Sequence, residues 1–578
     1  MMLRQIPGLM LLFIAATFGL QAGESTRASR QLVATANPHA SAAGIEMLRR
    51  GGSAVDAAIA AELVLTLVEP QSSGIGGGGF IMHFDGTNKL IESYDGRETA
   101  PKAIQPDVFL KDDGTPMGYL EAAYGGRPVG VPGMLRLFET VHKQHGKLPW
   151  ASLFGPAIKL AKNGFNVSPR LHYLLTSYST RLQKAGIALD DLGTARNYFF
   201  DAGGTAWPTG HLLKNPAYAA TLELLAQQGA DAFYQGPLAE AIIQTVKNAP
   251  LAPATITPED MTGYQVIRRA PVCGAYRAHT LCSMGPPSSG ATTVLGILGI
   301  LEHFDLKAAG VQSAQAVHLF AEASKLAYAD REQYLADPAF AVVPTKGLTD
   351  PAYLRGRAGL IDPYRAAATV QAGMPQGTDD RLAAHNGHDY PSTSHMVIRD
   401  QWGNAVSFTA TVQAAFGSFL MTGGFLLNNE LTDFAFQPQE NGVPVANRAE
   451  GGKRPRSSMA PFLVTDADGR LKMAVGSPGG SRIISYVAKT LIGVLDWGLD
   501  IQSAIELPNM VNKAGVMELE SGKGMERLQA DLGKLGHSRV QLRTLNSGLH
   551  GLVVHEEGDK TWMTGGADPR REGVVEVD

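Results

Sequence analysis

The chain has 578 residues, of which 44% are hydrophobic and 18% charged, the composition of a soluble globular protein with a large buried core. Its 50 basic and 54 acidic residues nearly balance, giving a formal net charge of −4. This balance argues against a nucleic-acid partner, because nucleic-acid-binding proteins neutralise phosphates with a clustered positive field.

The first 22 residues are typical of a secretory signal peptide. Arg4 precedes an apolar run from about residue 6 to residue 20, and small residues follow it. The run is shorter than the ~20 apolar residues of a membrane span. We expect cleavage after Ala22 and export to the periplasm or the medium. No comparable apolar run follows, so we expect no membrane span in the mature protein.

Residues 34–68 are predicted to form two helices separated by Gly51 and Gly52. The second helix is almost wholly apolar, which predicts that it is buried. Four consecutive glycines follow at positions 76–79. They suggest a phosphate-binding loop, but no GK[ST] sequence follows and the glycines lead into a strand. We expect them instead to permit close backbone packing or positive φ angles.

The pattern changes along the rest of the chain. Residues 130–390 are predicted to be mainly helical, whereas strand patterns dominate beyond residue 393. The turns QWGN and DADGR connect the expected strands. A polar loop rich in glycine and proline covers residues 437–456 and is long enough to have a function of its own.

Cys273 and Cys282 flank a predicted hairpin whose turn lies near residues 277–279. The two thiols would face each other across the strands and form a disulfide in an oxidising compartment. The alternative is a pair of buried free thiols. Two cysteines cannot form a structural zinc site unaided, and the sequence has no HExxH motif or histidine-rich cluster, so we expect no metal.

In the sequence STSHMVIRD, Thr393 stands at the first residue of a predicted strand and directly follows Ser392. The sequence has no GxSxG motif in a strand–turn–helix setting and no SxxK motif before a helix. A threonine that becomes N-terminal by chain cleavage can use its own α-amine as the base. With a reference pKa of ~7.7–8.0, that amine keeps a neutral fraction near pH 7. The pattern therefore indicates a candidate nucleophile at Thr393.

The segments TSHMVIRDQWGNAVSFT, GGFLLNNELTDF, KRPRSSMAP and GSPGGSRI resemble those of the γ-glutamyltranspeptidase (glutathione hydrolase) family. Upstream, YDGRETAP and AYADREQYLADPAF agree with it, as does the C-terminal GGADPRREG. The resemblance implies an α/β (α+β) protein of the N-terminal-nucleophile hydrolase type, a four-layer αββα sandwich without a cofactor. It also implies that the precursor cleaves its own Ser392–Thr393 bond. A large subunit, residues 23–392, and a small subunit, residues 393–578, would then form an intertwined heterodimer.

The resemblance also implies the role of each site residue. Thr393 would attack the γ-carbonyl of glutathione or another γ-glutamyl compound, and water, an amino acid or a peptide would then accept the acyl group. Thr411 would orient the nucleophile, and the backbone amides of Gly479 and Gly480 would form an oxyanion hole. The implied substrate-binding residues are Arg97, Ser457 and Ser458 for the α-carboxylate, Glu430 and Asp433 for the α-ammonium group, and Gln413 beside them.

Two departures from the family pattern concern specificity. Gln413 stands where family members often carry asparagine, and the loop between Asp433 and Ser457 contains no tyrosine or tryptophan. Because this loop lacks tyrosine and tryptophan, the sequence does not predict whether the acyl group goes mainly to water or to an amine acceptor. A glutaryl or cephalosporin-type acylase of the same fold is the alternative function, and it needs no ammonium site. A non-processing binding protein that kept the fold is a third possibility.

Overall fold

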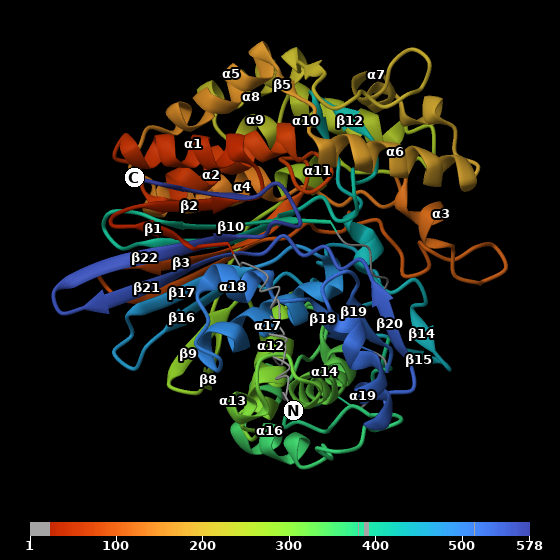
Figure 1. Cartoon of the computed structure of the whole chain (residues 1–578). Coiled ribbons are helices and arrows are strands. Elements are labelled where there is room, and N and C mark those ends of the chain that lie inside the picture. The colour runs from red at the N-terminus through yellow and green to blue at the C-terminus, as the bar shows by residue number, and fades with distance from the viewer. Residues whose placement is uncertain (1–22, 380, 386–391, 514) are drawn as a thin grey trace, which may run out of the picture.

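The computed structural model describes residues 23–379, 381–385, 392–513 and 515–578. The predicted signal peptide, residues 1–22, lies outside the described residues. Within them, two stacked seven-stranded sheets have helices on both outer faces (Figure 1). This arrangement confirms the predicted four-layer αββα sandwich.

The first sheet carries the predicted nucleophile at the start of one of its central strands. All neighbouring strands in it are antiparallel. In spatial order its strands are β23 (Val574–Val577), β2 (Leu32–Thr35), β10 (Ser394–Arg399), β11 (Ala405–Thr411), β3 (Gly78–Asp85), β4 (Leu90–Gly96) and β7 (Ile267–Arg269).

The second sheet is also antiparallel throughout and lies below the first in Figure 1. Its strands in spatial order are β1 (Thr26–Ala28), β22 (Lys560–Ala567), β21 (His550–Glu557), β17 (Leu471–Gly476), β16 (Phe462–Thr465), β9 (His279–Ser283) and β8 (Val272–Tyr276).

Both helices predicted within residues 34–68 are present, as α1 (Pro38–Arg49) and α2 (Ala54–Val68). Ser53 begins α2 with a capping box, in which its hydroxyl accepts from the Asp56 amide and the Asp56 carboxylate accepts from the Ser53 amide. Every residue of α2 is buried, as its apolar sequence predicts.

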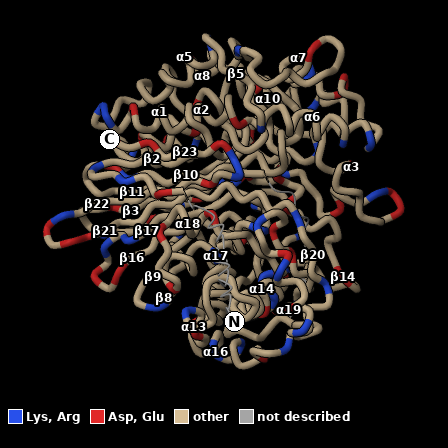
Figure 2. The backbone as a smooth tube through the Cα atoms, viewed as in Figure 1, with Lys and Arg blue, Asp and Glu red and all other residues tan. Residues whose placement is uncertain are grey.

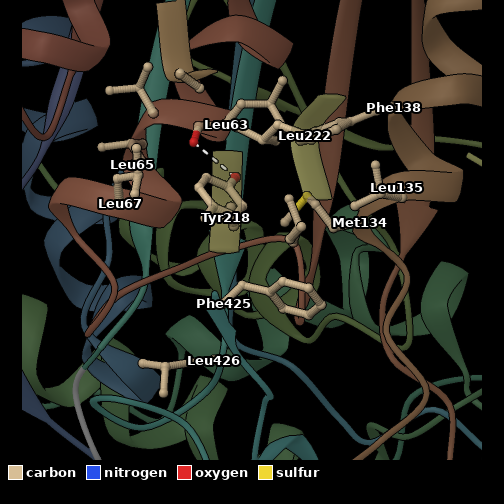
Figure 3. Packing of buried hydrophobic residues seen from close by; sticks show 14 of the residues in the cluster. Leu63, Leu65, Leu67, Met134, Leu135, Phe138, Tyr218, Leu222, Phe425 and Leu426 are labelled. Carbon is tan, nitrogen blue, oxygen red and sulfur yellow. Dashed lines mark hydrogen bonds between the residues drawn. The ribbon is translucent and has the colours of Figure 1, made fainter. Parts of the chain in front are cut away.

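Further helices pack around α2 above the first sheet. Figure 3 shows this core, in which the Tyr218 hydroxyl donates to the Leu63 carbonyl at 3.0 Å. These helices are α4 (Met134–His145), α5 (Gly155–Asn163), α6 (Pro169–Lys184), α8 (Pro216–Gln228), α9 (Asp231–Tyr234) and α10 (Pro237–Lys247).

A second helical layer covers the other outer face. Its main helices are α12 (Gly290–Leu301), α14 (Ala314–Tyr334), α17 (Ile483–Leu495) and α18 (Ile501–Glu506). Among the described residues, shorter helices in various parts of the fold are α3 (Tyr119–Ala123), α7 (Thr194–Phe199), α11 (Pro258–Thr262), α13 (Leu306–Ala309), α15 (Thr345–Leu348), α16 (Pro351–Ala358) and α19 (Leu528–Lys534). The minor strands are β5 (Phe165–Asn166), β6 (Leu212–Leu213), β12 (Met421–Thr422), β13 (Phe425–Leu426), β14 (Gln439–Glu440), β15 (Val443–Pro444), β18 (Met510–Asn512), β19 (Met517–Glu520) and β20 (Val540–Arg543).

Most other local predictions agree with the structure. Cys273 and Cys282 are direct partners in the β8–β9 hairpin and form a disulfide. The strand patterns beyond residue 393 correspond to β10, β11, β16 and β17, although α17, α18 and α19 also lie there. The loop at residues 437–456 contains the short hairpin β14–β15. Figure 2 shows residues of both charge signs along the outer loops. Among the described helices, none has the length and apolar character to cross a membrane.

The four glycines at positions 76–79 permit close contact between backbones. A Cβ built on Gly77 would lie 2.0 Å from the Thr411 carbonyl oxygen, and one on Gly76 would lie 2.1 Å from the Leu426 oxygen. A Cβ on Gly79 would lie 2.6 Å from the Thr409 oxygen. A side chain at position 77 or 79 would therefore push away β11, which carries Thr411, and one at position 76 would push away β13.

We predict that Gly77→Ala destabilises the protein by about 2 kcal/mol or more, because the new methyl group overlaps a hydrogen-bonded strand. Gly155→Ala is the matched control. Gly155 begins α5, and a methyl group added there would have no other atom within 4 Å, so alanine should be neutral or stabilising. Urea unfolding of both variants checks this, and equal midpoints would contradict the packing role.

Candidate active site

Thr393 directly precedes β10, which begins at Ser394, one residue later than the sequence predicts. Strand β11 runs antiparallel to β10 and ends at Thr411, opposite the start of β10. Thr393 has a φ of 90°, a backbone conformation that is rare for a β-branched residue. Both threonines are buried, so the sheet fixes the place of the candidate nucleophile.

The two threonine hydroxyls contact each other, with 3.3 Å between the Oγ1 atoms of Thr393 and Thr411. The backbone amide of Gln413 donates a hydrogen bond to Thr411 Oγ1 at 2.8 Å. Because Thr411 Oγ1 already accepts this bond, its own proton is available for the Thr393 oxygen. Thr411 can therefore orient the nucleophile, as the family resemblance implies.

The Ser392 carbonyl is held from the second sheet. Its oxygen accepts a hydrogen bond from the Gly479 amide at 3.1 Å. Gly479 follows the end of β17 and has a φ of 135°, where a non-glycine residue would be strained. The Ser392 hydroxyl donates to the Gln71 carbonyl at 2.6 Å. A backbone donor thus already points at the carbonyl next to Thr393, as an oxyanion hole requires.

A cavity of about 300 Å³ opens beside Thr393. It brings together most of the site residues predicted from the sequence, and Gly479 lies behind it at the Ser392 carbonyl. The predicted residues that line the cavity are Thr393, Thr411, Gln413, Arg97, Glu430, Asp433, Ser457, Ser458 and Gly480.

Arg97 forms the centre of a buried ion-pair cluster at one side of this cavity. It follows β4 and is 1% exposed. Its guanidinium pairs with the Glu430 carboxylate and, at 2.5 Å, with Asp433 Oδ2. Gln413 Nε2 donates to the other Asp433 oxygen at 2.9 Å. The residues expected to bind opposite ends of a substrate therefore also bind one another.

Glu98 adds a second buried carboxyl group next to Glu430. Burial raises the pKa of Glu98 to about 7 and the pKa of Glu430 well above its ordinary value. Glu98 raises the pKa of Glu430 further, whereas a hydrogen bond with Glu430 lowers the pKa of Glu98, and the Arg97 charge lowers the pKa of both. The two carboxyl groups therefore titrate as a pair, and Arg97 holds the negative charge that remains.

The two predicted serines directly follow Pro455 and Arg456, whose carbonyls accept hydrogen bonds from Arg97, and further cations line the cavity near them. The Ser458 hydroxyl accepts from Arg331 Nη2 at 2.7 Å. The Ser457 hydroxyl accepts from the Met459 amide at 3.1 Å. Arg456 pairs with Glu332 at 2.5 Å, and Lys513 also lines the cavity. Among the described residues, the cavity wall thus carries charges of both signs, which suits a ligand that is itself zwitterionic.

Comparison with known proteins agrees with this geometry. A sequence model of the family described as Gamma-glutamyltranspeptidase matches residues 40–577. The chain belongs to the γ-glutamyltranspeptidase family. It is 35% identical over 556 residues to the glutathione hydrolase proenzyme of Bacillus subtilis (strain 168), covering 94% of this chain and 91% of that one.

Relatives with a different name are equally similar. The acylase ACY 1 proenzyme of Pseudomonas sp. (strain V22) is 34% identical over 559 residues, covering 94% of this chain and 93% of that protein. The solved structure of cephalosporin acylase from Bacillus halodurans superposes with a TM-score of 0.84 at 25% identity, covering 98% of this chain and 99% of that one. Membership of the γ-glutamyltranspeptidase family therefore does not by itself fix the substrate.

Sequence reasoning assigned no role to Arg571, which contacts the candidate nucleophile. Its Nη1 donates to the Thr393 carbonyl at 2.9 Å, and its Nε donates to Asn546 Oδ1. Burial lowers the pKa of Arg571 to about 9, with Arg170 adding to the shift and Glu69 opposing it. The residue lies in the segment GGADPRREG, part of the family resemblance, and that segment was the available signal. Arg571 thus holds the Thr393 backbone through its carbonyl oxygen.

Two histidines lie between the sheets behind the nucleophile. His395 on β10 donates to or accepts from Thr409 Oγ1 at 2.9 Å, and its ring occupies the place where a Cβ on Gly476 would be. Burial, together with the nearby His550 on β21, holds the pKa of His395 well below its ordinary value. Burial also lowers the pKa of His550 to about 4. Both imidazoles are therefore neutral at pH 7.

These histidines make stability depend on pH. Between pH 6.5 and about 4 the unfolded chain protonates His550 and the folded chain does not, so stability falls as the pH falls through this window. We expect a loss of roughly 3 kcal/mol from this residue, fully developed near pH 4. The variant His550→Gln should show a flatter dependence of the urea midpoint on pH.

His303→Gln is the control for this experiment, because His303 is exposed. The urea midpoint of this control variant should depend on pH in the same way as that of the unaltered protein. If the midpoint of His550→Gln did so as well, the buried neutral imidazole would not be a source of the acid sensitivity.

Proposed function

We propose that this protein is a self-processing γ-glutamyltransferase and glutathione hydrolase with Thr393 as its nucleophile. One observation carries the proposal: the Thr393 hydroxyl, the Thr411 hydroxyl and the Gly479 amide converge on one point beside a cavity with a buried Arg97–Glu430–Asp433 cluster. The first three groups fit acyl transfer, and the cluster fits a ligand end that carries both charges.

The proposed maturation is one acyl shift followed by hydrolysis. Thr393 Oγ1 attacks the Ser392 carbonyl carbon, the C–N bond breaks, and the nitrogen takes the proton to become an amine. Water then hydrolyses the resulting ester and leaves a carboxylate on Ser392. The Gly479 amide would stabilise the oxyanion, an effect typically worth ~2.7–4 kcal/mol. The unfavourable φ of Thr393, which costs about 1–3 kcal/mol, would be released by cleavage.

In the proposed turnover, the freed α-amine of Thr393 accepts the proton of its own hydroxyl. The oxygen attacks the γ-carbonyl of glutathione or a related γ-glutamyl compound, and the rest of the substrate leaves as an amine. Water or the amine of an amino acid or peptide then takes the γ-glutamyl group. Glu430 and Asp433 would bind the α-ammonium group of the substrate, and Arg97 with the two serines its α-carboxylate.

The proposal includes export to an oxidising compartment, as a heterodimer of the two cleavage products. The N-terminal sequence supports export, and so does the disulfide between Cys273 and Cys282, since such bonds persist mainly outside the reducing cytosol.

A glutaryl or cephalosporin-type acylase is the second candidate, favoured by the relatives with acylase names. A glutaryl group has no ammonium group. The buried carboxylate of Glu430 and the partly buried carboxylate of Asp433, which line the cavity, would then gain no cationic partner from the substrate. This arrangement supports the γ-glutamyl substrate over the glutaryl one.

The cleavage is tested with Thr393→Ala. We expect the variant to remain one chain without activity, because the attacking oxygen is absent. Mass spectrometry of the unaltered protein should find a polypeptide that begins at Thr393. An active protein with an intact 392–393 bond would refute the mechanism.

Substrate choice is tested with Asp433→Asn. We expect kcat/KM for a γ-glutamyl anilide to fall about 10- to 100-fold more than that for the matching glutaryl anilide, since an ion pair with the ammonium group is lost. The ratio cancels any general damage from the broken contact with Arg97. Equal losses of kcat/KM on both anilides would contradict the proposal that Asp433 binds the ammonium group.

A further inference from the structure

A second group of convergent side chains lies outside the active-site cavity, near the far ends of β3 and β4. His83 on β3 and Glu92 on β4 are direct partners in the strand register. His145, the last residue of α4, lies over both strands, and its ring stacks on that of His83 at 3.9 Å between centroids. None of the three residues lines the cavity beside Thr393.

The donor atoms of this group have the spacing of metal ligands. Glu92 Oε2 lies 3.5 Å from His83 Nδ1 and 3.2 Å from His145 Nε2, and the two nitrogens lie within 4.8 Å of each other. Two ligands bound tetrahedrally at ~2.0–2.1 Å are separated by about 3.3–3.4 Å. Both carboxylate–imidazole distances are close to that value.

Hydrogen bonding within the protein leaves this group incompletely satisfied. His83 Nδ1 is buried without a hydrogen-bond partner and points at the Glu92 carboxylate from a distance longer than an ordinary hydrogen bond. The Tyr94 hydroxyl donates to Gln144 Oε1 at 2.6 Å and lies 2.7 Å from His145 Nε2, so a metal ion bound at this nitrogen would displace the single Tyr94 contact.

We propose that His83, Glu92 and His145 form a binding site for a divalent transition-metal cation of the zinc type. Two imidazoles and one carboxylate suit zinc, whereas calcium and magnesium prefer oxygen ligands alone. The His145 side chain is 17% exposed, so the site is open to solvent on one side. Bound metal would tie β3 and β4 to the end of α4.

The neighbouring Arg268 opposes the binding of a cation. Its guanidinium pairs with Glu92 Oε1, the carboxylate oxygen that faces away from the histidines. The Arg268 side chain is 57% exposed and can move into solvent. Its charge weakens metal binding without blocking it, and removing that charge should strengthen binding.

A second histidine–glutamate group, His318, Glu322 and His537, offers a natural comparison. Its atoms are already bonded: His318 Nδ1 contacts His537 Nε2 at 2.9 Å, and His318 Nε2 donates to the Asp362 carbonyl. Lys325 Nζ pairs with Glu322 at 2.6 Å. A cation here would have to displace both hydrogen bonds beside a lysine, so this group serves as the control.

The test uses the full chain without an affinity tag, treated with EDTA and then dialysed. Calorimetric titration with ZnCl2 should give one zinc ion per chain, and zinc should raise the melting temperature. His145→Gln and Glu92→Gln should each weaken zinc binding at least tenfold and abolish the thermal shift, whereas His537→Gln should bind as the unaltered protein does. Equal metal-free melting temperatures and circular dichroism spectra would show that the variants fold.

The variant Arg268→Ala gives a test in the opposite direction. It should bind zinc several-fold more tightly, because a positive charge is removed from the Glu92 carboxylate. Cobalt provides a spectroscopic check, since its visible absorption should be that of a tetrahedral site and should be lost in His145→Gln. No saturable zinc binding, unchanged affinity in His145→Gln, or loss of binding in His537→Gln would overturn the proposal, as would an unchanged or weaker affinity in Arg268→Ala.

Discussion

The hydrogen bond from the Gly479 amide to the Ser392 carbonyl joins the two sheets at the candidate reaction centre. Its donor follows β17 in one sheet, and its acceptor precedes β10 in the other. Both strands are central in their sheets, where neighbours on each side fix the backbone. The stacking of the sandwich therefore sets the distance between nucleophile and oxyanion donor, and loops contribute little freedom to it.

The same constraint explains the glycines that surround the site. Strand β3 must lie close enough to β11 to support Thr411, and only residues without a Cβ leave room for the Thr411 and Thr409 carbonyls. Arg571 fixes the Thr393 carbonyl from a segment 178 residues away. Thr393 is thus held through its carbonyl, its hydroxyl and the preceding peptide group, which can maintain its unfavourable φ.

Local patterns predicted much of the structure, because they depend on neighbours in sequence. The two helices around residues 51–52, the hairpin with its disulfide, and strands β10 and β11 follow from periodicity and turn residues. Motif resemblance alone placed Arg97, Glu430 and Asp433 in one pocket, where each would bind a different group of the same ligand. The structure also pairs Arg97 directly with both carboxylates. Sequence periodicity describes residues within one helix or strand, so it does not predict which residues of different layers come into contact.

The site residues that the sequence did not predict come from separate segments of the chain and meet only in the folded protein. Arg571 reaches Thr393 across the fold, and His83, Glu92 and His145 meet only because β3 pairs with β4 beneath the end of α4. Their separations in sequence match no ligand motif, which is why the sequence indicated no metal site. The expectation of no metal rested on motifs, and motifs record only ligands that one local segment supplies.

Buried charge next to the nucleophile limits what the cavity can bind. Arg97, Glu98 and Glu430 are buried, and the Asp433 side chain beside them is 24% exposed, so each buried charge is stable only while an opposite charge compensates it. In the proposed mechanism, a γ-glutamyl ligand brings one charge of each sign and exchanges an internal ion pair for two external ones. A ligand with a carboxylate alone would add a negative charge to a cluster in which burial already raises the pKa of two carboxyl groups. In the proposed mechanism, the reacting carbonyl would lie where the Ser392 carbonyl lies now and the far end of the substrate would lie at the Arg97 cluster, so the site would select both the length and the charges of the acyl group.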